Sequence, residues 1–508
     1  MKTKLLFILG CIFWYVQMFS QSNRIVDRII HFDQFVKHLQ SRQVNTATIR
    51  LDSITRKNYD AVNSVYNLSS MDIFLFDSNN LNTEYSFNIW DVNNSVLFQQ
   101  GKTEYVFNAS GMISSKTDYY FDSSLNVMVP SQKHLYTYNA SGQVIEMLSQ
   151  QYDTASSQFV NQDKEIYTYA QTTDPKPNLV NIYQWDTANA TWIDDKRGTI
   201  TYNSNFQFTD IIIEAKDISN NTWVNSFHYI RNYDANFRLL EHLMQQWQSN
   251  AWVNVRKKSV SYTSMANYDE IVIENFNWDS VNSSWAINDK HIEHVDSNNN
   301  ILQEEYYYWD SLNSQLFGSN KLVYNYNTND IEVDYYMWDS QTQNWSSDIL
   351  SKYVFNYDMS VPKSDLILPY YLTPSGLPTD TLFETGIPAF DGLNHKLLSK
   401  EFFSRATASD PWSPVFKKIY NYTDTSVSIE DHRQITAKVY PNPFSDHIRF
   451  EVASDTYSLN LFDLNGRLLF AADLNANESV NLSFLNKGIY IYKVQTNQGV
   501  ASGKIIKK

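Results

Sequence analysis

The polar and apolar positions along this chain repeat with a period of about 31 residues. Each unit is anchored by a large residue, usually aromatic, that is followed by aspartate. The anchors are Tyr59-Asp60, Trp90-Asp91, Phe121-Asp122, Tyr152-Asp153, Trp185-Asp186, Lys216-Asp217, Trp247-Gln248, Trp278-Asp279, Trp309-Asp310 and Trp338-Asp339. Consecutive anchors are 29 to 33 residues apart, and most are 31 apart. A fixed period of this length indicates a repeat architecture.

Within a unit, the aromatic residues alternate as they do in strands. Tyr136 and Tyr138 lie two residues apart, as do Tyr183 and Trp185, so each pair shares one face of a sheet. Turn formers such as Asn139-Ala140-Ser141-Gly142 separate the strands, and a second turn follows each anchor. Each unit is therefore predicted to be one β-hairpin. A large apolar residue seven positions after the anchor, and usually a basic one twelve after it, keep the same register.

About ten such hairpins predict an all-β fold of roughly twenty antiparallel strands over residues 21–435. A sheet of that size must twist, coil or close. The sequence does not decide between these, and an open, coiled or superhelical meander is the expected form. Blades of the WD propeller need about 40–45 residues, so the Trp-Asp pairs do not predict a propeller.

The repeat is interrupted near its end. Seven of the twelve prolines lie between Pro362 and Pro414, and proline disrupts a regular ladder. The interval 359–402 is therefore predicted to be an irregular insertion or a cap. A last degenerate unit follows at Phe403, Trp412 and Tyr422.

The N-terminus has the pattern of a secretory leader. Lys2 and Lys4 precede an apolar run, and Ser20 offers a small residue for cleavage, so residues 1–20 are predicted to be a signal peptide. A membrane anchor and acylation at Cys11 are the alternatives. Since Cys11 is the only cysteine, cleavage leaves a chain without disulfides. A net charge of −15 argues against nucleic acid and anionic membranes as partners.

The composition changes again from about Ala437. Four short motifs follow in order, and their Asn-Gly and Lys-Gly turns between alternating strands predict a small β-sandwich at 436–508. The residues singled out in them are Tyr440, Pro441, Asn442, Pro443, Phe444, Gly466, Arg467, Gly488, Tyr490, Lys507 and Lys508.

These motifs resemble the type A C-terminal sorting domain of the type IX (Por) secretion system of Bacteroidota. The resemblance implies export through the signal peptide, a partner in the type IX machinery, and a secreted or outer-membrane-surface location. In that family the domain is commonly removed, and the cargo is released or attached. The repeats resemble Tyr/Trp-rich hairpin repeats found upstream of such domains and, more loosely, YD repeats.

Catalytic or metal-binding patterns are weak, and no cofactor or metal is predicted. His291 and His294 come closest to a metal pair, but three residues apart in a strand they face opposite ways. The recurring aspartates could form a row of calcium ligands. Aspartate just past a strand more often bonds the backbone of its own turn, so we expect a turn role. The repeated base is expected at an exposed strand position or beside a neighbouring acid.

The aromatic positions allow two interpretations, a stacked core or a solvent-facing platform for glycan or protein. The platform candidates are Trp185, Trp192, Trp223, Trp278, Trp285, Trp309, Trp338 and Trp345. Asp-Ser/Thr-aliphatic triplets resemble the O-glycosylation site of Bacteroidota and give six candidate acceptors, which intact mass would test. They are Ser53, Thr154, Thr187, Ser280, Ser311 and Thr381.

The sequence thus predicts a non-catalytic secreted or cell-surface repeat protein that binds glycan or protein in adhesion or scavenging. One alternative is a passive spacer or coat protein. The other is a polysaccharide-acting enzyme with its site in the 359–402 insertion.

Overall fold

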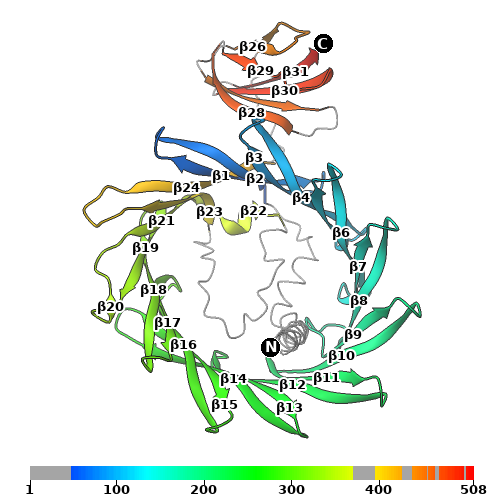
Figure 1. Ribbon diagram of the computed structural model, residues 1–508, viewed down its shortest axis with the longest axis vertical. Coiled ribbons are helices and arrows are strands. Elements are labelled where there is room, and N and C mark those ends of the chain that lie inside the picture. Colours follow the sequence, from blue (N-terminus) through cyan, green and yellow to red (C-terminus); the bar gives the residue numbers. More distant parts are fainter. Residues whose placement is uncertain are drawn as a thin grey trace, which may run out of the picture.

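The computed structural model describes residues 47–369, 395–425 and 437–508, except for 453, 455, 464–467, 477 and 497–498. Figure 1 shows two parts, a ring of β-hairpins and a smaller C-terminal part. One short 3-10 helix, η1 (Lys363–Asp365), accompanies the strands in these residues, which confirms the all-β prediction. None of the described residues form a helix with the length and apolarity needed to cross a membrane. The predicted leader at 1–20, with Cys11, lies outside the described residues.

The long strands of the ring form one antiparallel sheet in which each pairs with its neighbours in chain order. Its long strands are β1 (Ile49–Asp60), β2 (Val65–Phe76), β3 (Asn82–Asp91), β4 (Val96–Phe107), β5 (Ile113–Asp122), β6 (Val127–Tyr138), β7 (Val144–Asp153), β8 (Gln158–Thr168), β9 (Leu179–Asp186), β10 (Thr191–Tyr202), β11 (Phe208–Asp217), β12 (Thr222–Tyr233), β13 (Leu239–Gln248), β14 (Ala251–Ser264), β15 (Asp269–Asp279), β16 (Ser284–Val295), β17 (Ile301–Asp310), β18 (Gln315–Tyr326), β19 (Asp330–Asp339), β21 (Ser351–Pro362), β23 (His395–Ser404) and β24 (Ser413–Asp424). Two short pieces, β20 (Asn344–Trp345) and β22 (Leu366–Ile367), pair with β19 and β1.

The sheet closes on itself because β24 pairs antiparallel with β1. Leu51 lies opposite Tyr422 across this seam, and Asn421 Nδ2 donates to Ser53 Oγ at 3.1 Å although 368 residues separate them in the chain. The expected open, coiled or superhelical meander is therefore wrong. Closure has a plain physical advantage, since it gives the first and last strands partners for backbone groups that an edge strand leaves unpaired.

The insertion predicted at 359–402 is regular at both ends. Strand β21 continues to Pro362, and β23 begins at His395 and pairs with β21 and β24. The degenerate last unit thus supplies the strands that close the ring. Residues 370–394 lie outside the described residues.

Each strand buries one side of its alternating pattern. In β11, Ile211 and Ile213 are fully buried, and they pack in a cluster with Tyr229 of β12 and Met244 of β13. Alternation with a period of two places these side chains on one face of the sheet. The ring therefore has one face that is strongly apolar, as the sequence pattern indicated.

In five units the residue seventeen positions after the anchor is a tyrosine that ties the hairpin to a preceding segment, and Tyr422 does the same in the last unit. Each hydroxyl donates to a backbone carbonyl 25 residues before it, over distances of 2.7 to 3.0 Å, in Tyr138 to Ile113, Tyr169 to Val144, Tyr202 to Pro177, Tyr233 to Phe208, Tyr326 to Ile301 and Tyr422 to Leu397. Burial raises the pKa of Tyr326 to about 12, so this donor keeps its proton. The high tyrosine content is thus partly structural.

The C-terminal part has two sheets that share one apolar core. One contains β25 (Lys438–Tyr440), β26 (His447–Glu451) and β29 (Ser479–Asn481), and the other contains β27 (Thr456–Phe462), β28 (Leu468–Asn475), β30 (Gly488–Thr496) and β31 (Gly499–Lys507). Phe450 and Leu461 come from different sheets, and both are fully buried. Strand β28 contacts β4 of the ring.

Candidate functional site

The turn after each anchor is built around the anchor's aspartate. Asp60 Oδ1 accepts from the backbone N–H of Val62 at 2.9 Å, and Asp60 Oδ2 accepts from Asn63 Nδ2 at 2.7 Å. The same bonds recur at the aspartates of the other turns, for example Asp91 and Asp279. Since hydrogen bonds to a carboxylate favour its charged form, they lower the pKa of these aspartates. The prediction of a turn role is confirmed.

The four residues after that aspartate form the tip of the hairpin, and many tips carry an exposed aliphatic side chain. These side chains are between 63 and 93% exposed, and they belong to Val62, Val92, Leu125, Ile218, Val281 and Leu312. Figure 1 shows the hairpins pointing outward around the ring. Six of the described hairpin tips around the ring therefore carry an exposed large apolar side chain, and the others do not.

Directly behind each tip, the anchor faces the large residue seven positions on, and we call the two a tip pair. Trp185–Trp192, Trp278–Trp285 and Trp338–Trp345 each meet edge to face with ring centroids 5.0 Å apart. Trp309 lies opposite Leu316 and is 38% exposed. Trp223 lies opposite Lys216. The eight platform candidates thus occupy equivalent positions behind the tips.

Cations two strands away lie over several of these rings. Lys164 Nζ is 4.8 Å from the centroid of Trp192, and Arg197 lies 4.6 Å from that of Trp223. Such cation–π contacts occupy ring faces that a sugar would need. Some of the bases twelve positions after an anchor pair with acids as expected: Lys102 lies 3.5 Å from Glu84, and Arg197 lies 2.5 Å from Glu214.

The candidate glycosylation sites differ in accessibility. Thr154, Thr187, Ser280 and Ser311 follow the aspartate in exposed turns. Ser53 does not, because it lies within β1, is 8% exposed and accepts a hydrogen bond from Asn421. Ser53 is therefore not an accessible acceptor in the folded ring. Thr381 lies outside the described residues.

The two histidines of β16 have different surroundings, as their spacing predicted. His291 is buried and stacks on Tyr306, with centroids 4.2 Å apart, whereas His294 stacks on Tyr268 and lies 3.4 Å from Glu270. They share no ion-pair partner among the described residues.

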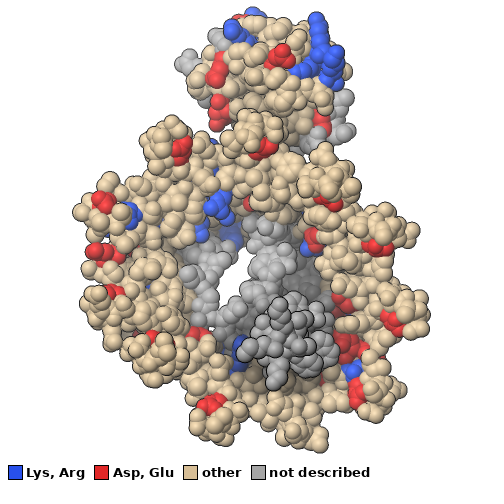
Figure 2. Space-filling model, viewed as in Figure 1, with Lys and Arg blue, Asp and Glu red and all other residues tan. Residues whose placement is uncertain are grey.

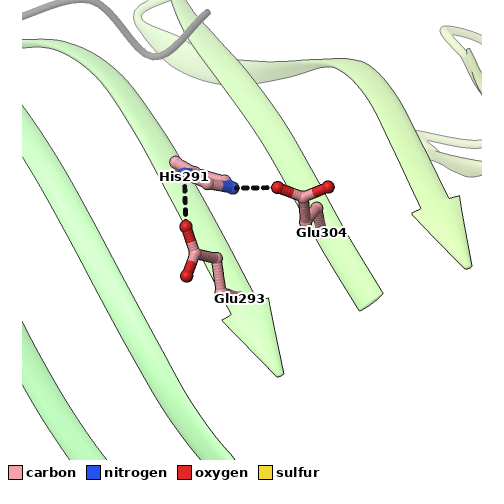
Figure 3. A group of neighbouring side chains, drawn as sticks. All are labelled: His291, Glu293 and Glu304. Carbon is pink, nitrogen blue, oxygen red and sulfur yellow. Dashed lines mark ion pairs between the residues drawn. The ribbon is translucent and has the colours of Figure 1, made fainter. Parts of the chain in front are cut away.

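Instead, the structure brings His291 together with Glu293 and Glu304 (Figure 3). His291 Nδ1 lies 3.5 Å from Glu293, and Nε2 lies 3.6 Å from Glu304. Burial opposes ionisation of Glu304, but bonds from His291, Tyr324 and Tyr306 outweigh it and hold its pKa below the ordinary value. Burial raises the pKa of Glu293. One histidine and two carboxylates suit a divalent metal, yet both Glu304 oxygens already accept tyrosine hydroxyls, so the arrangement serves a buried hydrogen-bond network.

In the C-terminal part, the first and last sorting motifs lie side by side. Asn442 Nδ2 donates to the carbonyl of Lys504 at 3.0 Å, and the N–H of Ile506 donates to Asn442 Oδ1 at 2.9 Å. Phe444 is 1% exposed, and its backbone N–H donates to the carbonyl of Ile506. Lys507 Nζ donates to the carbonyls of Leu482 and Ser483.

The third motif joins the same structure. Gly488 lies opposite Lys507 in the sheet. The hydroxyl of Tyr490 donates to the carbonyl of Asn486 at 2.7 Å. Tyr440 is exposed, and Lys508 donates its N–H to the carbonyl of Phe444. Gly466 and Arg467 lie outside the described residues.

Comparison with known proteins identifies this part. Residues 438–508 match the family described as the secretion system C-terminal sorting domain. The match supports a type IX-sorted protein of Bacteroidota, exported to the cell surface or the extracellular space, with the type IX machinery as an implied partner. The predicted similarity to YD repeats stays a prediction.

No curated protein matches the chain. Among solved structures, a protein of unknown function from Bacteroides fragilis is 18% identical, covering 27% of this chain and 96% of its own, with a TM-score of 0.22. A porin-like protein from Bacteroides uniformis is 10% identical, covering 61% of this chain and 96% of its own, with a TM-score of 0.21.

Proposed function

We propose that the ring is a non-catalytic binding module, carried outside the cell by its sorting domain, that engages an extracellular partner in adhesion or scavenging. The observation that carries this proposal is the repeated set of exposed aliphatic side chains on the hairpin tips. Val281 is 89% exposed and Leu312 is 93% exposed, on consecutive hairpins. Scattered surface apolar residues are ordinary, but exposed apolar residues that recur on the tips of several repeats are typical of an interaction surface.

The chemistry of the tips favours a protein over a sugar. The aliphatic side chain itself forms no hydrogen bond, and the tip asparagines Asn282 and Asn313 already donate to the turn aspartates. Cations of this chain also lie on the rings of tip pairs such as Trp185–Trp192. Further exposed apolar residues stand just before the anchors, at Ile89, Tyr120, Tyr308 and Met337. Several weak contacts on one rigid ring also combine, because each bound tip raises the effective concentration of the next.

The test is the binding of the purified secreted chain to extracellular-matrix protein panels and to glycan arrays. Replacing Val281 and Leu312 together by aspartate is expected to weaken protein binding about tenfold or more, which corresponds to the loss of about 1.4 kcal/mol. Ala188→Asp is the matched control, because Ala188 lies in an exposed tip that has no large aliphatic side chain. Equal binding by all three proteins would show that these tips are not the binding surface, and no binding at all would favour a passive spacer. Polysaccharide cleavage that is lost on deleting 370–394, which leaves the ring strands β21 and β23 intact, would favour an enzyme.

A further inference from the structure

The seam that closes the ring carries three cations in one row. Lys400 of β23 lies directly opposite Lys418 of β24, and Lys418 lies directly opposite Arg56 of β1. Residues directly opposite one another share a face, with Cβ atoms about 4.5–5.5 Å apart. Like charges in such pairs destabilise a sheet. The row therefore opposes the closure of the ring in which it lies.

These cations lack the salt bridges that other basic residues of the ring have, although the charge of Lys418 opposes the burial that raises the pKa of Asp72. Lys352 lies 2.7 Å from Glu332, Lys321 lies 3.3 Å from Glu305, and Lys417, next to Lys418 in sequence, lies 2.6 Å from Glu401. Within 47–369 and 395–425, no carboxylate lies within salt-bridge distance of Arg56, Lys400 or Lys418. Burial, together with the charge of Lys418, lowers the pKa of Lys400, as expected for an uncompensated cation. The chain as a whole has a net charge of −15, so this row is a local positive region on an acidic protein.

Aromatic rings flank the row on the same face. Lys400 Nζ lies 4.4 Å from the centroid of Tyr353, and the Arg56 guanidinium lies 4.7 Å from that of Phe416. Phe402 stacks on Phe416 with centroids 5.6 Å apart. The rings help to hold the cations but do not neutralise their charge.

A cavity of about 360 Å³ opens at one end of the row, within the size range of small-ligand sites. Its walls are Ile54, Arg56, Ser70, Asp72, Tyr85, Phe87 and Lys418. The hydroxyl of Tyr85 donates to Asp72 at 2.9 Å. The cavity thus combines two cations, two hydroxyls, a carboxylate and two aromatic rings. Figure 2 shows basic side chains gathered along the opening of the ring on the side of β1 and β24.

We propose that this seam binds an acidic sugar chain, with Arg56 and Lys418 holding its carboxylate or sulfate. Asp72 and Ser70 are placed to bond sugar hydroxyls, and Tyr85 and Phe87 supply apolar contact for the sugar ring. A bound oxyanion also removes the repulsion within the row, so ligand binding stabilises the closed ring. The site is separate from the hairpin tips, so the test of this proposal is independent of the test of binding at the tips.

The experiment is calorimetric titration of the full secreted chain with three tetrasaccharides: tetragalacturonate, a sulfated heparin fragment, and neutral galactotetraose. At least one acidic sugar is expected to bind and the neutral one is not, and the two acidic probes distinguish a carboxylate ligand from a sulfate ligand. Arg56→Gln with Lys418→Gln is expected to weaken that binding by about a hundredfold, since each charged hydrogen bond contributes roughly 1.5–3 kcal/mol. Lys418→Gln alone is expected to weaken it about tenfold.

Lys57→Gln is the matched control, because Lys57 follows Arg56 in β1 and therefore points to the opposite face. It removes the same charge and is expected to change affinity less than twofold. The melting temperature of the double variant without ligand is expected to equal or exceed that of the parent, because repulsion is removed. Two results would overturn the proposed binding: acidic sugars that bind no better than galactotetraose, or an equal loss of affinity in Lys57→Gln. A double variant that melts earlier than the parent would overturn the inferred stabilisation of the closed ring by the ligand.

Discussion

Trp185 and Trp192 meet edge to face across the hairpin of β9 and β10, with ring centroids 5.0 Å apart and ring planes at 64°. Nearly the same geometry recurs at Trp247–Trp252, at 70°, and at Trp278–Trp285, at 69°. One contact geometry thus holds the outer end of several hairpins. Edge-to-face pairs contribute about 0.5–1.5 kcal/mol beyond their buried area.

Breaking that pair should destabilise the hairpin measurably. Trp185→Ala is expected to cost about 2–3 kcal/mol, below the 3–5 typical of a fully buried tryptophan because the ring is half-exposed. Urea unfolding of Trp185→Ala, Trp192→Ala and the double variant gives the coupling energy, which should be about 1 kcal/mol. Additive losses would mean that the two rings do not stabilise each other.

Gly318 makes room for another tip pair. A Cβ at this position would lie 2.1 Å from Cε3 of Trp338 and 2.8 Å from Cη2 of Trp345. Gly318→Ala should therefore displace both rings and destabilise the ring by about 1–3 kcal/mol, with a changed tryptophan fluorescence. Gly488→Ala is the control, since its Cβ would meet nothing nearer than 3.8 Å. If Gly318→Ala changed neither the stability nor the tryptophan fluorescence, Trp338 would have another position available.

The last residue of the tip after Trp185 adopts a strained backbone. Ala190 has φ of 51°, in the left-handed region that costs an L-residue about 1–2 kcal/mol. Asn126 and Asn221 occupy the equivalent position in other hairpins, and asparagine tolerates this conformation. Ala190→Asn should raise the unfolding free energy by about 0.5–1 kcal/mol in thermal melts. Ala188→Asn, two residues earlier in the same turn, should give no gain.

The aspartates of the tips predict sensitivity to acid. Hydrogen bonds lower the folded-state pKa of nine of them: Asp60, Asp91, Asp122, Asp153, Asp186, Asp217, Asp279, Asp310 and Asp339. Because each folded pKa lies below the unfolded value of 3.8, their stabilisation is present above that pH and is lost as pH falls through the folded values.

Melting temperatures measured between pH 6 and pH 2.5 should therefore fall mainly below about pH 4. Asp91→Asn should slightly reduce the fall in melting temperature at low pH, because it removes one of the titrating aspartates. The hairpin at Gln248 has no aspartate at this position, so Gln248→Asn should leave the acid profile unchanged. A flat profile from pH 5 to pH 2.5 would contradict the assigned role of the turns.

Asn442 joins the two ends of the sorting domain. Asn442→Ala removes bonds to the carbonyl of Lys504 and from the N–H of Ile506, and should lower the stability of this part by about 1–2 kcal/mol. Hydrogen exchange at Ile506 should accelerate, and export into the medium should decrease. Ser458→Ala, which removes an exposed bond to Asp473, is the control. Unchanged exchange at Ile506 would rule out the role given to Asn442.

Local features were predictable because local residues determine them. The turn at Asp60 follows from an aspartate whose side chain reaches the N–H groups of the next residues. The hairpins follow from alternation with a period of two, and the separation of His291 from His294 follows from their odd spacing. The sorting motifs were found by their order, although their mutual contact, as between Asn442 and Ile506, was not.

Non-local features were not predictable in this way. Nothing in the vicinity of Tyr138 shows that its hydroxyl bonds to the carbonyl of Ile113, since the partner depends on strand register. His291, Glu293 and Glu304 come from two strands whose pairing had to be known before the three could be grouped.

The sequence by itself determined the hairpin, its turn and its period, because alternation and turn chemistry act over a few residues. Only the tertiary structure decided that the sheet closes. Closure depends on the twist and curvature accumulated over all the hairpins, which bring β24 beside β1 at the end. That closure also aligns Lys400, Lys418 and Arg56, and so creates a site that no single repeat contains.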